Sequence, residues 1–333
     1  MTNQSDISTS TPNNSLADLD GAVNAPSTWL TNALSIPREE NYINVDGCDI
    51  HYFRWGDKSK PGILMMHGFL AHARCFAFIA PYLANNYHIV AYDHSGMGDS
   101  GTRDSYPNES RISEAMGVAT QTGLFDHAQK PIIVAHSFGG LVATNTIHQH
   151  PNSFAGFVIC DLMILRPSQI KKMSPLTPNN ITKQHKIYPD YKTAKARFRL
   201  APEQKIEHQE LFDYMAYHSL KQIETGWSWK FSTSLFNQKE NTPQGWAQIA
   251  KSVVTLPIRK TIIHGEQSAL FNSDSITYIQ ELLKEENKAD FPIIGIPQAR
   301  HHLMLDQPIA FISVLRMVLE IWRNETASMT SSS

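Results

Sequence analysis

Short, mainly apolar runs alternate with segments of helical spacing through most of this chain. The runs lack a strict alternation of apolar and polar positions, which is typical of strands buried on both faces. They are Gly62–Met66, Tyr87–Tyr92, Pro131–Ala135, Phe154–Cys160, Lys260–Ile263 and Phe291–Ile296, preceded by a further predicted strand over Asp49–Trp55. The spacing of apolar residues between them predicts helices over Ala73–Leu83, Leu141–His150, Ser275–Lys284 and Ala310–Trp322. This order predicts an α/β fold, a mostly parallel central sheet with helices on both faces.

The alternation is interrupted between residues 163 and 252, where no buried strand is evident. This stretch contains a predicted helix over Glu203–His218 and many aromatic residues. An insertion of this size between two core strands predicts a mainly helical cap over residues 163–252. The core is then formed by residues 29–162 and 253–325. Most aromatic residues of the cap are expected to pack in its own small core.

Both ends of the chain are poor in large apolar residues. Residues 1–28 are rich in Ser, Thr, Asn and Asp, and residues 326–333 are similar, so we expect both segments to be disordered. The N-terminus has neither the basic start nor the apolar stretch of a secretory signal. No apolar run approaches the roughly 20 residues that span a bilayer. These features predict a cytoplasmic protein without a membrane span.

The charge and cysteine content exclude several classes of partner. The 333 residues include 29 basic and 31 acidic side chains, with a formal net charge of −2, and no stretch concentrates Lys and Arg. The charge distribution therefore does not favour a nucleic acid or an anionic membrane as a partner. Three cysteines are too few for a disulfide framework, and no Cys/His cluster has zinc-ligand spacing. We expect a small-molecule substrate, no metal and no organic cofactor, while the oligomeric state stays open.

Ser137 lies where a buried strand is predicted to run through a tight turn directly into a helix. The surrounding sequence, Ala135-His136-Ser137-Phe138-Gly139, is similar to the Gly-x-Ser-x-Gly pattern of a nucleophile elbow. Ala135 replaces the first glycine of that pattern but is still small. The alternative is a serine that only caps the following helix. The strand-turn-helix setting favours Ser137 as a nucleophile.

Two backbone N–H groups are candidates for stabilising an oxyanion. The N–H of Phe138 follows Ser137 at a helix N-terminus, where the helix dipole favours negative charge. The N–H of Phe69 follows His67-Gly68 at the end of an apolar strand and is the second candidate. His67 itself is expected to brace its loop rather than to take part in catalysis.

A serine nucleophile needs a general base, and the position along the chain selects it among fifteen histidines. His301 and His302 lie after the last apolar strand and before the last predicted helix. A loop at this point emerges at the same sheet edge as Ser137, so either histidine can approach the serine. Two surface histidines without a catalytic role are the alternative.

The chain resembles the α/β-hydrolase superfamily over about residues 31–325. The resemblance is carried by His67-Gly68-Phe69, Asp93–Ser100, Ala135–Gly140 and His301–Pro308, in this order and spacing. In the family, the catalytic histidine usually stands seven residues before a proline that opens the last helix. Counting back from Pro308 selects His301, with Arg300 in place of the family's usual glycine. The resemblance implies that the Asp93–Ser100 loop is structural.

The third catalytic residue departs from the family pattern. The usual aspartate position, after the strand that precedes the final helices, holds Ser268, and a serine cannot stabilise an imidazolium as a carboxylate does. Asp161 is the preferred replacement, because some superfamily members carry their acid at the end of the strand that follows the elbow. Glu266 is the second candidate, and Asp274 or no acid at all are the others. The alternative role for Asp161 is to cap a helix or to brace a loop.

Together these residues predict a serine hydrolase that cleaves a carboxylic ester of a small or medium apolar substrate. Ser137 would form an acyl-enzyme, with His301 as base and Asp161 as its partner. Lactone, thioester and carbon–carbon bond hydrolysis would use the same residues. A ligand-binding relative with little turnover is the alternative from another class. A serine nucleophile argues against dehalogenase or epoxide hydrolase chemistry, which in this family uses aspartate.

Overall fold

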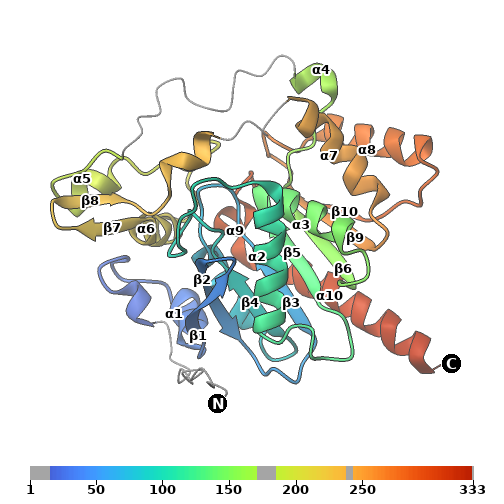
Figure 1. The fold of residues 1–333 in the computed structure, drawn as a ribbon, viewed down its shortest axis with the longest axis horizontal. Helices are drawn as coiled ribbons and strands as arrows, with labels where there is room; N and C mark the ends of the chain where they lie inside the picture. The colour runs from blue at the N-terminus through green and yellow to red at the C-terminus, as the bar shows by residue number, and fades with distance from the viewer. Residues whose placement is uncertain (1–15, 171–184, 238–242, 332–333) are drawn as a thin grey trace.

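An eight-stranded sheet forms the centre of the computed structural model, which describes residues 16–170, 185–237 and 243–331 (Figure 1). The strand order is β1-β2-β4-β3-β5-β6-β9-β10. Strand β2 is antiparallel to both β1 and β4, and all other neighbouring strands are parallel. The strands are β1 (Glu39–Val45), β2 (Cys48–Trp55), β3 (Gly62–Met66), β4 (His88–Tyr92), β5 (Ile132–His136), β6 (Gly156–Cys160), β9 (Arg259–Gly265) and β10 (Ile293–Ile296). The predicted mostly parallel sheet is confirmed.

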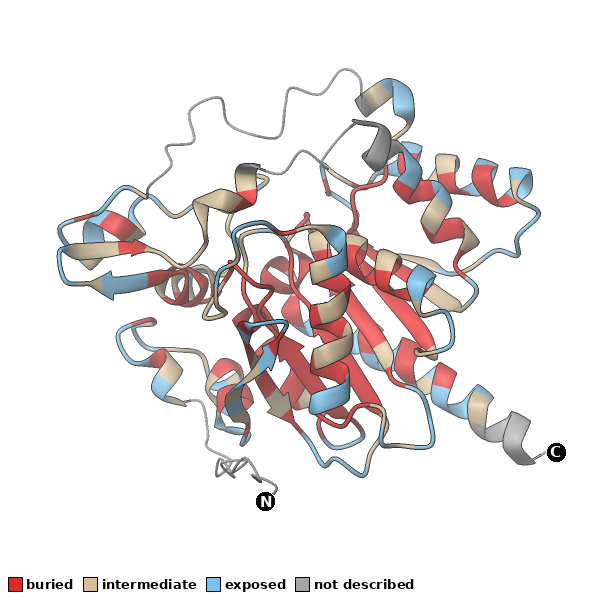
Figure 2. Ribbon diagram, in the orientation of Figure 1, coloured by how far each residue is buried: buried red, intermediate tan, exposed pale blue. Residues whose placement is uncertain are grey.

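Helices cover both faces of this sheet, which explains why its central strands are apolar throughout. Along β3, Ile63 and Met65 pack in one apolar layer, whereas Leu64 and Met66 pack in the other. Figure 2 shows the central strands as buried. One layer includes α1 (Thr28–Ser35), α9 (Leu303–Asp306) and α10 (Pro308–Ser331). The other includes α2 (Asn108–Gln121), α3 (Phe138–Gln149), α7 (Pro243–Thr255) and α8 (Ser273–Glu285).

Some elements differ from those expected. The predicted helix over Ala73–Leu83 is replaced by two 3₁₀ turns, η2 (Ala73–Phe76) and η3 (Ala80–Tyr82). Pro81 lies in the second turn and cannot donate the backbone hydrogen bond that a continuous α-helix would need there. Strand β1 was not predicted, because it lies at the sheet edge and most of its residues are at least partly exposed.

The ends of the chain are more ordered than their composition indicates. Residues 16–27 were expected to be disordered, but Leu16–Leu19 form a 3₁₀ turn (η1) with Leu19 buried. The Asp18 carboxylate lies 2.7 Å from the Arg38 guanidinium and accepts a hydrogen bond from the Tyr214 hydroxyl. Charge pairing with Arg38 and the packing of Leu19 against the core therefore hold this segment in place. Helix α10 also extends past the expected boundary at residue 325, whereas residues 1–15 and 332–333 lie outside the described residues.

The segment between β6 and β9 contains a hairpin as well as helices. Its described elements are α4 (Pro167–Ile170), α5 (Tyr191–Lys195), α6 (Gln209–His218), β7 (Leu220–Ile223), β8 (Gly226–Trp229) and η4 (Thr233–Asn237). Parts of the expected cap, residues 171–184 and 238–242, lie outside the described residues. Helix α7 begins before the expected boundary at residue 252, yet its Ile249 and Val253 pack in the apolar layer of the core. No helix of the described chain is both long and apolar enough to cross a membrane.

The turn between β5 and α3 brings two backbone segments into close contact. Ser137 lies in this turn with φ 50° and ψ −117°, a conformation that residues with a side chain rarely adopt. A Cβ atom at Gly139 would lie 2.6 Å from the carbonyl oxygen of Met66 and 2.8 Å from that of His67. At Gly140, the nearest atom to a Cβ would be a Leu162 side-chain carbon at 3.4 Å. Helix α3 can therefore begin against the end of β3 only because residue 139 is glycine.

This contact predicts different effects for two adjacent glycines. Gly139→Ala is expected to lower the free energy of unfolding by about 2 kcal/mol or more, because backbone atoms must move apart. Gly140→Ala is the matched control and should change it by less than about 1 kcal/mol, since alanine also favours the helix. Chemical denaturation of both variants measures the difference. Equal stability of the two variants would contradict the close packing.

Candidate active site

Four loops meet at the carboxyl edge of the parallel strands, where open α/β sheets place their ligand sites. Strand β3 leads to Phe69, β5 to Ser137, β6 to Asp161, and the segment after β10 to His301. The backbone fixes these strand ends relative to one another. The Ser137 N–H donates to the Cys160 carbonyl at 2.9 Å, and the Asp161 N–H donates to that of Ile263 at 2.9 Å.

His301 and Asp161 form a buried hydrogen-bonded pair. Nδ1 of His301 lies 2.8 Å from Oδ1 of Asp161, and the two side chains are 3% and 0% exposed. With its Nδ1 proton donated to the carboxylate, the neutral imidazole keeps Nε2 free to accept a proton. This is the tautomer that a general base requires.

Ser268, which occupies the family's usual acid position, is bonded to the carboxylate that His301 uses. Its Oγ donates to Oδ1 of Asp161 at 2.6 Å, and the Gly265 N–H donates to Oδ2 at 2.8 Å. Glu266 is exposed and has no hydrogen bond to His301 in the described part of the chain. Asp274 is also excluded as the partner of His301, because its half-exposed carboxylate accepts from Gln169 and lies near Arg166. Among the sequence candidates, only Asp161 contacts the histidine.

The two neighbouring histidines hold His301 and the insertion in place. Nε2 of His136 lies 2.9 Å from the carbonyl oxygen of His301, and Nε2 of His302 lies 3.2 Å from that of Ala201. Burial lowers the pKa of His136, and burial beside His301 lowers the pKa of His302 to about 3. Both rings are therefore neutral near pH 7, and each donates its single N–H to a carbonyl.

The backbone on either side of His301 is also held by hydrogen bonds. The Arg300 N–H donates to Oδ2 of Asp306 at 2.7 Å, and the His302 N–H donates to Oε1 of Gln204 at 3.0 Å. The Gln204 amide then donates to Oδ1 of Asp306 at 2.8 Å and closes the ring. Sequence reasoning missed Gln204 because its partners lie about a hundred residues away along the chain.

Ser137 and the two candidate oxyanion donors lie close together at the start of α3. Ser137 is partly exposed, and the rings of Phe69 and Phe138 are 5.5 Å apart. Neither the Phe69 N–H nor the Phe138 N–H donates a hydrogen bond within the described residues, so both are available to a ligand. No hydrogen bond joins the Ser137 hydroxyl to the His301 ring in the same part of the chain. Such contacts often tighten only when substrate binds.

The loops beside this site are braced by buried polar groups. His67 lies 2.8 Å from the Gly68 carbonyl oxygen through Nδ1, and its Nε2 accepts from the His94 N–H at 3.0 Å. The Asp93 carboxylate accepts from the N–H groups of Ala73 and Asp99. These bonds give His67 and the Asp93–Ser100 loop the supporting positions expected from the sequence.

One group of side chains in the described ranges, His51, Asp93 and Asp99, is close enough to share a metal ion. All three are already engaged. His51 lies 2.8 Å from Asp93, and Asp99 pairs with Arg74 at 2.6 Å and with Lys230 at 2.5 Å. A metal ion at this position would compete with two fixed cationic side chains.

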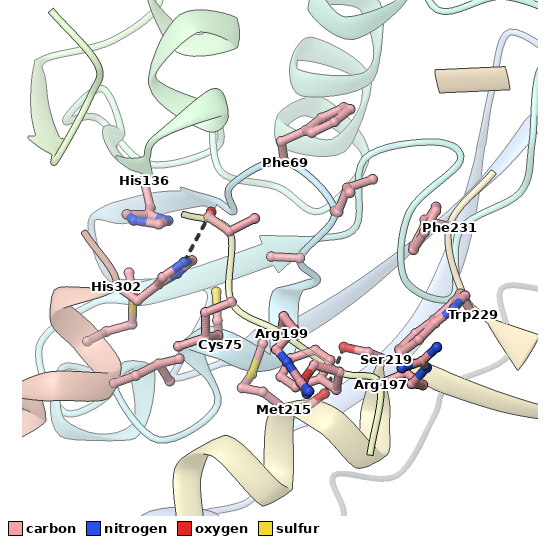
Figure 3. A pocket seen from close by; sticks show the side chains of 17 residues that line it. Phe69, Cys75, His136, Arg197, Arg199, Met215, Ser219, Trp229, Phe231 and His302 are labelled. Carbon is pink, nitrogen blue, oxygen red and sulfur yellow. Dashed lines mark hydrogen bonds between the residues drawn. The ribbon is translucent and has the colours of Figure 1, made fainter. Parts of the chain in front are cut away.

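A cavity of about 230 Å³ lies between the core and the insertion (Figure 3). The core contributes Phe69, His136 and His302, which are themselves site residues or direct neighbours of Ser137 and His301. The insertion contributes mainly apolar side chains, including Phe198 and Trp229. The cavity therefore adjoins the candidate active site and suits a largely apolar ligand.

Comparisons with known proteins agree with this architecture. The model of the "Alpha/beta hydrolase family" matches residues 63–314. Epoxide hydrolase 1 of Caenorhabditis elegans is 28% identical over 137 residues, which are 40% of this chain and 32% of that protein. Monoacylglycerol lipase ABHD6 of Rattus norvegicus is 25% identical over 170 residues, 51% of this chain and 48% of the lipase. The chain thus spans less than half the length of either relative.

Solved structures share the fold at low sequence identity. The thioesterase domain from the curacin biosynthetic pathway superposes with a TM-score of 0.64 at 22% identity, covering 83% of this chain and 98% of the domain. The sequence motifs, the sheet topology and the match over residues 63–314 lead to one conclusion: this chain belongs to the alpha/beta hydrolase family.

Proposed function

We propose that this protein is a serine hydrolase that cleaves a carboxylic ester of a small or medium apolar substrate. The observation that carries the proposal is the buried 2.8 Å hydrogen bond between His301 and Asp161, at the sheet edge where Ser137 occupies a strained turn. A serine with a strained backbone conformation does not by itself indicate catalysis. A strained serine beside a histidine oriented by a buried carboxylate is the arrangement of a catalytic triad.

In the proposed mechanism, His301 Nε2 takes the hydroxyl proton as Ser137 Oγ attacks the substrate carbonyl carbon. The resulting oxyanion accepts hydrogen bonds from the Phe69 and Phe138 N–H groups, aided by the N-terminal dipole of α3. His301 then protonates the leaving alcohol, which departs and leaves an acyl-enzyme. Water, deprotonated by His301, then attacks the acyl carbon; the bond to Ser137 Oγ breaks, His301 returns the proton to Oγ, and the acid leaves. Asp161 holds the imidazole and stabilises its cationic form.

Ester hydrolysis is favoured over the epoxide chemistry named for one relative. The resemblance implies that epoxide hydrolases of this family use an aspartate nucleophile, whereas this chain has Ser137. The other relative is named a lipase, which fits a serine nucleophile beside an apolar cavity. Thioesters, lactones and carbon–carbon bonds remain alternative substrates of the same residues.

We also propose that the segment after residue 163 acts as a cap, since its side chains form one wall of the cavity.

An activated serine can be detected without knowing the substrate. Wild-type protein is expected to react stoichiometrically with a fluorophosphonate probe, because in the proposed triad His301 takes the Ser137 proton and two N–H groups stabilise the adduct. Ser137→Ala should abolish labelling, and Ser268→Ala, which keeps the nucleophile, should retain it. Intact-mass spectrometry measures the adduct. A folded wild type that does not react would favour a ligand-binding protein with little turnover.

The identity of the acid is tested by comparing two carboxylates. Asp161→Asn should lower kcat for an activated aryl ester by roughly 10⁴-fold, because the amide favours the wrong histidine tautomer. Glu266→Gln, the matched control, should leave kcat within about twofold, since Glu266 is exposed and does not contact His301. Thermal unfolding would verify that both variants are folded. The reverse pattern would assign the role to Glu266.

A further inference from the structure

Three of the polar side chains that line the cavity are neutral and have no hydrogen-bond donor left for a ligand. His136 and His302 each use their single N–H on a carbonyl group, as described above. The Ser219 hydroxyl donates to the Met215 carbonyl at 2.7 Å. Apart from two arginines, the other lining residues are apolar.

Among the described residues, the charged side chains that line the cavity are those of Arg197 and Arg199, and none of the acidic ones lines it. Both are exposed. Arg199 uses one of its terminal nitrogens on the carbonyl groups of Ala196 and Phe198, which leaves its other guanidinium donors free. Within the described residues, the Arg197 side chain makes no hydrogen bond, and neither guanidinium group has a carboxylate partner. Figure 3 shows both arginines across the cavity from Phe69 and His136.

An apolar cavity with two unpaired guanidinium groups suits a ligand that is apolar along its length and anionic at one end. The planar fork of arginine binds the oxygens of a carboxylate or a phosphate through paired hydrogen bonds. The position of the arginines opposite Phe69 and His136 places such an anion away from Ser137. The reacting carbonyl would then lie at the other end of the ligand.

We propose that this protein prefers apolar esters that carry an anionic group, a carboxylate or a phosphate, at the end remote from the reacting carbonyl, and that Arg197 and Arg199 bind this group. The inference rests on the proposed ester hydrolysis for the orientation of the substrate. The binding of the anionic end can be measured separately from turnover.

The binding test uses Ser137→Ala protein, so that turnover plays no part. Isothermal titration with octanoate, octyl phosphate and 1-octanol compares three ligands with the same apolar chain. At least one anion should bind roughly tenfold more tightly than the alcohol, and the tighter anion identifies the headgroup. Adding Arg197→Gln and Arg199→Gln should remove this preference. Lys192→Gln, which removes an exposed cation of the same insertion outside the cavity, should preserve it.

The kinetic test compares the p-nitrophenyl ester of octanoic acid with the mono-p-nitrophenyl ester of octanedioic acid. Wild type should show a kcat/KM roughly tenfold higher for the anionic ester, and this preference should shrink as salt rises. The double arginine variant should lose the preference, so that its kcat/KM values for the two esters agree within about twofold. Equal binding of the alcohol and both anions, or a preference that survives in the variant, would overturn the inference. Loss of all turnover with anion binding intact would instead count against the proposed ester hydrolysis alone.

Discussion

The Asp161 carboxylate is the group on which the arrangement of the site depends. It is fully buried, and a buried carboxylate is tolerated only when its oxygens accept hydrogen bonds. Its donors come from two separate parts of the chain: His301 after β10, and Gly265 and Ser268 at and just after the end of β9. Asp161 itself follows β6. One side chain therefore ties together two strand ends and the loop that carries the histidine.

The position of this carboxylate also explains the departure of the sequence from the family pattern. In the proposed triad the acid stands at the end of β6, and the position that usually holds it, in the loop after β9, is taken by Ser268. Ser268 fills it with a donor, because its hydroxyl binds Asp161 at 2.6 Å and accepts from the Leu270 N–H. In the proposed triad, Ser268 thus donates a hydrogen bond to Asp161 and does not itself act as the acid.

Sequence reasoning predicted the features that local pattern determines. The buried strands were visible as apolar runs, because helices cover both faces of the sheet, and the proposed roles of Ser137 and His301 follow from motif spacing. The choice between Asp161 and Glu266 required a distance between residues more than a hundred positions apart, which one sequence does not contain. The same limit hid the Asp18–Arg38 pair, which holds residues 16–27 against the core together with the buried Leu19. The β7–β8 hairpin was missed because neither strand has a buried apolar run: β7 carries two exposed polar residues, and most residues of β8 are only partly buried.

Residues 197–204 connect the ligand cavity to the loop that carries His301. Arg197 to Ala201 line the cavity, while Ala201 and Gln204 bond to His302 and Asp306. An outward swing of this stretch would widen the cavity, but it would also break the hydrogen bonds that fix the backbone beside the histidine. The same hydrogen bonds therefore control whether a ligand can enter from this side and how the His301 ring is aligned. Evolution of a wider entrance would have to replace Gln204 with another support for the histidine loop.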